Sequence, residues 1–351
     1  RLHSALNSEM PPGTIISFHL LNTPHINEQI AQYVNAREVV DPAMIRLDPL
    51  VKDLPQKRAE FFRRMSRGEE ADQVTESNTA CLIVSVKVPC SEWPIPDDER
   101  RATLEVGATI SEACAAAFIP VVVCDAPTYL MLFRRILRPF EPLDFTYSPR
   151  QMLSNQVLRP GSTVDATATE VILDDAVYVR QLQPFALPDE MSLAFMAHLP
   201  GDPGGLSNQI RCPFMISTVL HYPDRGTKTR YLRSKRNKLL YQAMGPIRKW
   251  NTKIDRMLSG LDLLTSQIDT DNDLPVEMSF SILLFHKDLE QLARESSRVM
   301  SFWGGFNFQM AAERNITFPS FWNSLPAMAT SESIVNSFRF NTVPSTCAVH
   351  F

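Results

Sequence analysis

The sequence has little glycine and lacks the glycine motif that holds phosphate groups. It contains 12 glycines among 351 residues, against a usual share of roughly 7%, and no glycine is followed directly by lysine. A phosphate loop needs two spaced glycines and a Gly-Lys pair, so that backbone N–H groups and the ammonium reach the phosphates. The stretch Gly226-Thr-Lys-Thr229 has no upstream glycine at the required distance. We therefore expect no nucleotide site within these residues.

Other catalytic and metal-binding motifs are also absent from the sequence. The seven histidines show no HExxH or HxxxH spacing, and no GxSxG sequence offers a nucleophile. The run from Asp269 to Asp273 begins like a calcium loop, but Leu274 and Phe280 replace the required glycine and glutamate. We predict no catalytic, cofactor-binding or metal residues in this chain. Asn272 and Asp273 are instead predicted to form a turn.

Paired cysteines and long apolar runs are missing as well. Single cysteines without a CxxC pair are typical of reduced, buried thiols in a cytosolic protein. The longest apolar run, from Ala113 to Cys124, contains Pro120 and is shorter than the roughly 18 residues of a membrane span. The six cysteines are Cys81, Cys90, Cys114, Cys124, Cys212 and Cys347.

The residues that are present describe an ordinary folded protein. The apolar share of 44% and charged share of 21% exclude a disordered chain. The net charge of −4 gives no global reason to expect a polyanionic partner. A length of 351 residues favours two domains. Prolines 139, 142 and 149 place the boundary near residue 145, so we predict units at 1–145 and 146–351.

Strand-like and helix-like patterns alternate along both halves, which predicts an α+β fold of two mixed subdomains. Helical patterns cover residues 49–67, 96–118, 129–137 and 287–302. Runs rich in β-branched and aromatic residues predict strands at residues 14–21, 80–89, 119–124, 169–182, 191–198, 214–222, 276–285 and 306–310.

A heptad pattern marks a long helix in the second half. Apolar residues recur at alternating steps of three and four, which predicts one packed stripe. Its partner is either the rest of the same domain or a helix of a second chain. The stripe consists of Ile247, Trp250, Ile254, Met257, Leu261, Leu264 and Ile268.

A basic run overlaps the start of this pattern. Residues 225–256 hold eleven cations and a single acid, Asp255. At 100° per residue, the first seven cations of a helix here would point to all sides of its axis. This distribution suits a solvated arm or an acidic partner better than binding within a single groove. The predicted partner-binding residues are Arg225, Lys228, Arg230, Arg233, Lys235, Arg236 and Lys238.

The order of several short motifs resembles a known family. The opening Met10-Pro-Pro-Gly13 with Ile16-Ser-Phe18 is similar to that of the TraC-like conjugation ATPases of type IV secretion systems. Residues 35–37 and 57–62 resemble the ends of the two helices that follow this opening in that family. The stretches Leu220–Asp224, Phe321–Pro326 and 348–349 resemble the region just before that family's motor domain.

This resemblance implies the N-terminal docking and assembly domain of an ATPase that energises pilus biogenesis and DNA or protein transfer. It implies a motor domain beyond residue 351, which would carry ATP and Mg²⁺. It further implies a location at the cytoplasmic side of the bacterial inner membrane, with channel components and neighbouring subunits as partners, in a dimer or hexamer.

Two other classes of protein stay open at this point. One is a stand-alone nucleic-acid-binding protein that uses residues 225–256, with Tyr231, Tyr241 and Trp250 as the available stacking aromatics. The other is an enzyme whose active site follows no recognised motif.

Overall fold

The structure is a computed structural model of the chain. It describes residues 10–38, 50–66, 78–116, 118–141, 146–158, 161–188, 201, 210–244, 253–330 and 341–344.

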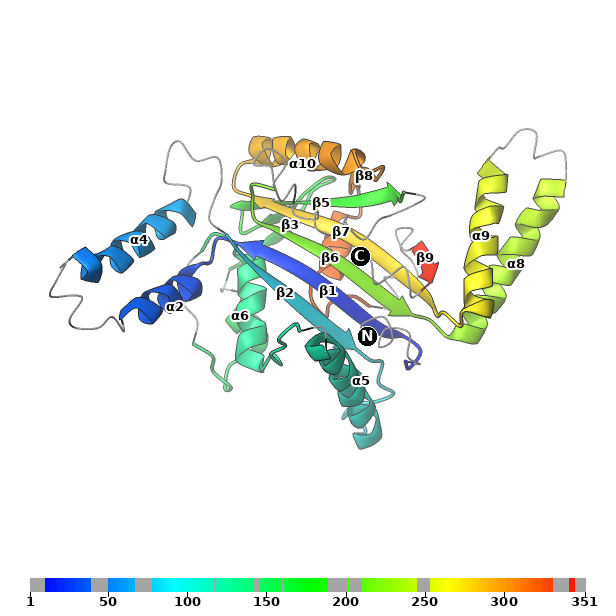
Figure 1. Ribbon diagram of the computed structural model, residues 1–351, viewed down its shortest axis with the longest axis horizontal. Coiled ribbons are helices and arrows are strands. Elements are labelled where there is room, and N and C mark those ends of the chain that lie inside the picture. The colour runs from blue at the N-terminus through cyan, green and yellow to red at the C-terminus, as the bar shows by residue number, and fades with distance from the viewer. Residues whose placement is uncertain are drawn as a thin grey trace.

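The centre of the described chain is one antiparallel sheet (Figure 1). Its strand order is β2-β1-β6-β7-β5-β4-β3, while β8 pairs with β5 and β9 with β7. The α+β class predicted from the sequence is confirmed. The strands are β1 (Thr14–Thr23), β2 (Thr79–Lys87), β3 (Val164–Ala166), β4 (Val171–Leu173), β5 (Val177–Ala186), β6 (Phe214–Tyr222), β7 (Pro275–His286), β8 (Gln309–Ala312) and β9 (Asn341–Pro344).

Helices lie on both faces of this sheet. Alternate strand residues point to opposite faces, so Ile282 and Leu284 pack under one set of helices and Leu283 and Phe285 under another. The first face is covered by α10 and the second by α6 and α11. The helices are α2 (Asn27–Glu38), α4 (Leu50–Ser66), α5 (Asp97–Ala116), α6 (Ala126–Leu137), α7 (Leu153–Val157), α8 (Arg225–Met244), α9 (Lys253–Thr270), α10 (Leu289–Gly304) and α11 (Thr317–Asn323).

The core of the described chain is centred on strand β6. All nine residues of β6 are buried, because β1 and β7 flank its edges and helices cover its faces. Its β-branched and aromatic residues suit a strand buried on both faces. The predicted strands at 14–21, 80–89, 214–222 and 276–285 are confirmed with small changes at their ends.

The sheet runs across the predicted boundary near residue 145. Strand β1 pairs with β6 from Thr14–Tyr222 to Asn22–Phe214, so strands from both predicted units share one ladder. The division at residue 145 therefore falls between elements of one continuous sheet, and separate folding of the two units stays a prediction.

Three expectations from the sequence are wrong, and two fall outside the described residues. The predicted strand at 169–182 is two strands, β4 and β5, because Asp174 and Asp175 form a turn with positive φ between them. Residues 119–124 form no strand: Val122 and Val123 are exposed, because no neighbouring strand pairs with this segment. Cys90 and Cys124 are exposed rather than buried, since both lie in segments outside the helices and strands. The predicted strand at 191–198 lies outside the described residues, as does Cys347.

Candidate functional site

Helices α8 and α9 form an antiparallel hairpin that projects from one end of the sheet (Figure 1). The two helices pack through Leu232 of α8 and Leu264 and Ile268 of α9, which are all buried. Leu261 is half-buried in the same contact. Of the predicted heptad stripe, Ile254 is also buried, whereas Met257 is 48% exposed. The stripe thus packs within its own chain at Ile254, Leu261, Leu264 and Ile268 but not at Met257. Ile247 and Trp250 lie outside the described residues.

The base of the hairpin is tied to the sheet by one carboxylate. Glu277 of β7 accepts a hydrogen bond from His221 of β6 at 2.7 Å and forms an ion pair with Lys228 of α8. The hydrogen bond from His221 is the largest influence that lowers the pKa of Glu277, to about 2, and Lys228 adds to it against the desolvation. The strand and the helix therefore share an ionised group at neutral pH.

Further cations of α8 are paired with residues of α9 and the turn after it. Arg233 forms an ion pair with Asp269 at 2.8 Å, and Arg236 pairs with Asp262. Arg225 donates to Oδ1 of Asn272 at 2.5 Å. The turn predicted at Asn272 is confirmed by its positive φ of 54°. These contacts orient the two helices and leave their cations partly neutralised.

The remaining cations of α8 lie on the arc that its ion pairs leave free, although Arg230 and Lys235 at the two ends of this arc also line hollows against α9. Arg230, Lys235 and Lys238 are exposed and form no ion pair with the described residues. Relative to Arg230, 100° per residue places Lys238 about 80° and Lys235 about 140° around the axis. Tyr231 and Tyr241 lie in the same arc and are 56% and 76% exposed. We call these five residues the outer face of α8.

This face changes the argument made from the sequence. The seven cations do surround the helix, but the four on the inner side have partners in the fold. Helix α8 contains no acidic residue, so nothing in it offsets the three cations that remain. The hairpin therefore presents a one-sided basic and aromatic surface.

The start of α8 is closed to a phosphate group. Oδ1 of Asp224 accepts a hydrogen bond from the backbone N–H of Thr227 at 2.8 Å, and Lys228 is engaged by Glu277. A carboxylate at a helix N-terminus occupies the position that an anion would take. Gly226-Thr-Lys-Thr229 thus does not fit a nucleotide, in line with the sequence.

A buried polar chain crosses the sheet on the face opposite α10. His19 sits at its centre and is fully buried. Its Nδ1 lies 2.9 Å from Oγ of Ser217, which donates to the carbonyl of Ser324 at 2.8 Å, so Nδ1 is the donor. Its Nε2 then accepts from Oγ of Ser17 at 2.9 Å, and Ser17 in turn accepts from Ser85. Each hydroxyl donates in one direction along the chain.

This arrangement requires a neutral imidazole. Desolvation by burial lowers the pKa of His19 to about 3, and a proton on Nε2 would face the hydrogen of Ser17. Both nitrogens are occupied by hydroxyl groups of the fold. His19 is therefore a core histidine with both ring nitrogens hydrogen-bonded, and the polar chain stabilises the fold rather than relaying protons to solvent.

The polar chain holds the segment Phe321–Pro326 and the residues after it against the sheet. Ser85 accepts from the N–H of Ala327 at 3.0 Å, and Nζ of Lys87 donates to the carbonyl of Ala329 at 3.0 Å. The hydroxyl of Tyr129 donates to the carbonyl of Pro326 at 3.3 Å. Sequence reasoning missed this contact, although the period of two in Ser17–His19 and in Gln181–Gln183 marks polar residues on a strand face.

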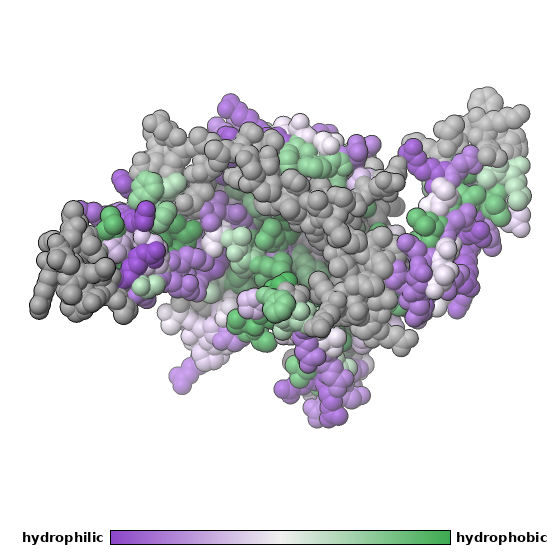
Figure 2. All heavy atoms as spheres, in the orientation of Figure 1, coloured by the Kyte–Doolittle hydropathy of each residue, from purple (hydrophilic) through white to green (hydrophobic). Residues whose placement is uncertain are grey.

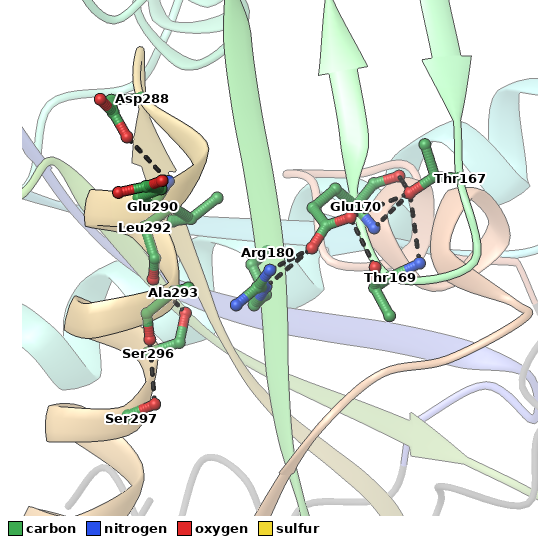
Figure 3. Close-up of polar contacts among 10 residues, drawn as sticks. All are labelled: Thr167, Thr169, Glu170, Arg180, Asp288, Glu290, Leu292, Ala293, Ser296 and Ser297. Atoms are coloured by element: carbon green, nitrogen blue, oxygen red, sulfur yellow. Dashed lines mark hydrogen bonds and ion pairs between the residues drawn. The ribbon is translucent and has the colours of Figure 1, made fainter.

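A second polar cluster stabilises the far edge of the sheet (Figure 3). Arg180 of β5 forms an ion pair with Glu170, whose carboxylate also accepts from the hydroxyls of Thr167 and Thr169. Burial is the largest single influence and raises the pKa of Glu170, but the hydrogen bonds together hold it below its usual value. Figure 3 also shows Asp288 at the start of α10, where it accepts from the N–H of Glu290 at 2.7 Å. These groups are satisfied by the fold.

The described residues form neither a cluster suited to a metal ion nor a helix suited to a bilayer. Among these residues no group of three or more His, Cys, Asp or Glu side chains could hold a metal ion. In the same ranges no helix is both long enough and apolar enough to cross a bilayer.

Comparison with known proteins connects the chain to one family. A family model described as TraC protein matches residues 1–329. No curated protein matches the sequence. The matched range includes both arms of the hairpin and the segment Phe321–Pro326.

Proposed function

Since the chain belongs to the TraC protein family of type IV secretion and conjugative transfer, we propose that it is a docking and assembly domain. In this proposal it is the N-terminal part of an ATPase that energises pilus biogenesis and the transfer of DNA or protein. Its partners are channel components at the cytoplasmic side of the inner membrane and neighbouring subunits of the same ATPase.

The observation that carries the proposal is the outer face of α8. Arg230, Lys235 and Lys238 lack ion pairs with the described residues, and two exposed tyrosines accompany them. Tyrosine and arginine are enriched where proteins bind one another, while unpaired cations on a projecting element steer acidic partners. A hairpin that projects from the sheet can reach a partner without rearrangement of the core (Figure 1).

Charge reversal on this face tests the proposed function. We expect Arg230→Glu, Lys235→Glu and Lys238→Glu together to disrupt assembly of the secretion complex in cells, because the contact with acidic partners becomes repulsive. Conjugative transfer frequency should fall by at least tenfold. The matched control is Lys57→Glu, Arg58→Glu and Arg150→Glu, which reverses three exposed cations away from the hairpin. Normal assembly in the first variant, or equal loss in both, would count against the proposal.

The chain itself is expected to leave nucleotide chemistry to another part of the ATPase. It has no Gly-Lys pair, and the Asp224 carboxylate caps the start of α8. Isothermal titration of residues 1–351 with Mg-ATP should therefore give no heat of binding. Micromolar binding would contradict this prediction.

One observation also favours nucleic acid as a second candidate partner of the same face. Exposed tyrosines beside cations can stack on unpaired bases while the cations contact phosphates. Binding of this kind to a single-stranded oligonucleotide would show a log–log salt slope of about −0.7 per phosphate contacted. The charge-reversed α8 variant would then lose oligonucleotide binding together with transfer.

A further inference from the structure

Helix α5 is the acidic counterpart of α8. It spans Asp97–Ala116 and contains five acidic and two basic residues. Asp98, Glu105 and Glu112 are exposed and seven residues apart. Seven residues fall about 20° short of two full turns, so these three carboxylates form one row about 20 Å long, with the exposed Arg101 on the same face between Asp98 and Glu105.

Exposed apolar residues occur before, within and after this helix. Trp93, just before α5, is 86% exposed, and Leu104 within the helix is also exposed. After the helix, Phe118 and Val122 are 96% and 85% exposed, in the segment that pairs with no strand. Apolar side chains in this number beside one helix indicate a protein contact rather than a solvated surface. A basic protein surface with aromatic residues would match both their polarity and the acidic row.

The outer face of α8 has these complementary properties. Both α5 and α8 contain 20 residues, which corresponds to about 30 Å each. One is acidic with apolar residues around it, and the other carries unpaired cations with two tyrosines. The hairpin and α5 lie at separate places on the sheet, and Figure 2 shows hydrophilic and apolar side chains together at both. Because they lie apart in one chain, they can meet face to face only between two chains.

We propose that the outer face of α8 in one copy of this chain docks on α5 of a second copy. This inference rests on the proposed function, because it names the neighbouring subunit as the partner of the α8 surface. The contact joins different surfaces of the two copies, so a pair keeps α5 free on one copy and α8 free on the other. Such a head-to-tail contact propagates into a ring when its rotation closes.

Two charge-reversed variants test this contact by mixing. The α8 variant carries Arg230→Glu, Lys235→Glu and Lys238→Glu, and the α5 variant carries Asp98→Lys, Glu105→Lys and Glu112→Lys. Sedimentation velocity of the wild-type chain at low salt should show reversible self-association, which weakens as salt is raised. Each variant alone should associate at least tenfold more weakly. Circular dichroism and thermal unfolding of each variant confirm that it is folded.

An equimolar mixture of the variants distinguishes this contact from general loss of charge. The reversed α8 of one variant then faces the reversed α5 of the other, and the two unchanged surfaces face each other. We expect the mixture to regain association within about threefold of the wild type. A photo-crosslinking amino acid at position 241 should label residues of α5 in the second copy.

Several outcomes would overturn the inference. These are a wild-type chain that stays monomeric at low salt, a mixture that stays as weak as each variant, and crosslinks from position 241 that avoid α5. The proposed function fails separately, because it predicts loss of secretion-complex assembly in cells with the α8 variant whichever protein the face contacts. Loss of assembly in cells together with a mixture that does not associate would keep the docking role and reject the second copy as the partner.

Discussion

At the scale of single residues, Glu277 connects the sheet to the hairpin. Its carboxylate faces His221 on the next strand and Lys228 on α8, and its side chain is 17% exposed. A half-buried carboxylate with two such partners stays ionised to low pH, and removal of the charge leaves Lys228 without its counter-ion.

We therefore predict that Glu277 stabilises the fold above its unfolded-state pKa. The pKa is depressed to about 2 in the folded chain, so the contribution is complete above about pH 4.5 and is lost as pH falls toward 2. At pH 7 the variant Glu277→Gln should lower the free energy of unfolding by on the order of 2–3 kcal/mol. Urea denaturation at pH 7 and pH 3 measures both values, and the difference between wild type and variant should fall by about half at pH 3.

A matched variant separates this effect from general loss of charge. Glu290 of α10 pairs with Arg294 on the surface, where its side chain is 86% exposed. Glu290→Gln should change the free energy of unfolding by less than about 0.5 kcal/mol at either pH. If the two substitutions change the free energy of unfolding equally, the contacts of Glu277 stabilise the fold no more than a surface ion pair does.

At the scale of elements, the hairpin is a separate packing unit on the end of β6 and β7. Its core consists of Leu232, Leu264 and Ile268 with part of Leu261, and among the described residues it shares no buried apolar cluster with the sheet. Elements with small cores of their own open more readily than the strands beneath them.

We predict that Ile268→Ala weakens the hairpin by about 2–4 kcal/mol, because a buried side chain is replaced by a cavity. Amide hydrogen exchange should accelerate throughout α8 and α9 and stay unchanged in β6 and β7. Leu263→Ala on the exposed side of α9 serves as the control and should leave exchange unchanged. Unchanged exchange in both variants would mean that this apolar contact does not hold the two helices together.

The residue patterns of single segments predicted most helices and strands of this chain. Contacts between residues far apart in the sequence account for the features that these patterns did not predict. The strand predicted at 214–222 and the helix predicted at 129–137 follow from neighbouring residues, and both are confirmed. The contact between His19 and Ser217 joins residues 198 positions apart, so only the register of β1 against β6 creates it. Likewise, the sequence alone does not show which cations of α8 are paired. The antiparallel hairpin pairs Arg233 with Asp269, and this kind of contact separates the paired cations from those of the outer face.

At the scale of the whole molecule, one sheet supports two elements of opposite charge. Helices α6, α10 and α11 cover the sheet and bury its apolar residues, and the polar chain through His19 fixes residues 321–329 on it. The hairpin extends away from this body, while α5 packs on the sheet through Ile110 and Cys114 and presents its acidic side chains to solvent (Figure 1). A rigid body with exposed charged helices suits a domain that assembles a larger complex.

The most direct test of the docking role is binding of the purified chain to inner-membrane fractions that contain the secretion channel. The account predicts that the wild-type chain co-sediments with these membranes and that reversal of Arg230, Lys235 and Lys238 weakens binding at least tenfold. Membranes without the channel and the Lys57, Arg58 and Arg150 reversal provide the controls. Equal binding of wild type and the α8 variant to channel-containing membranes would contradict the account.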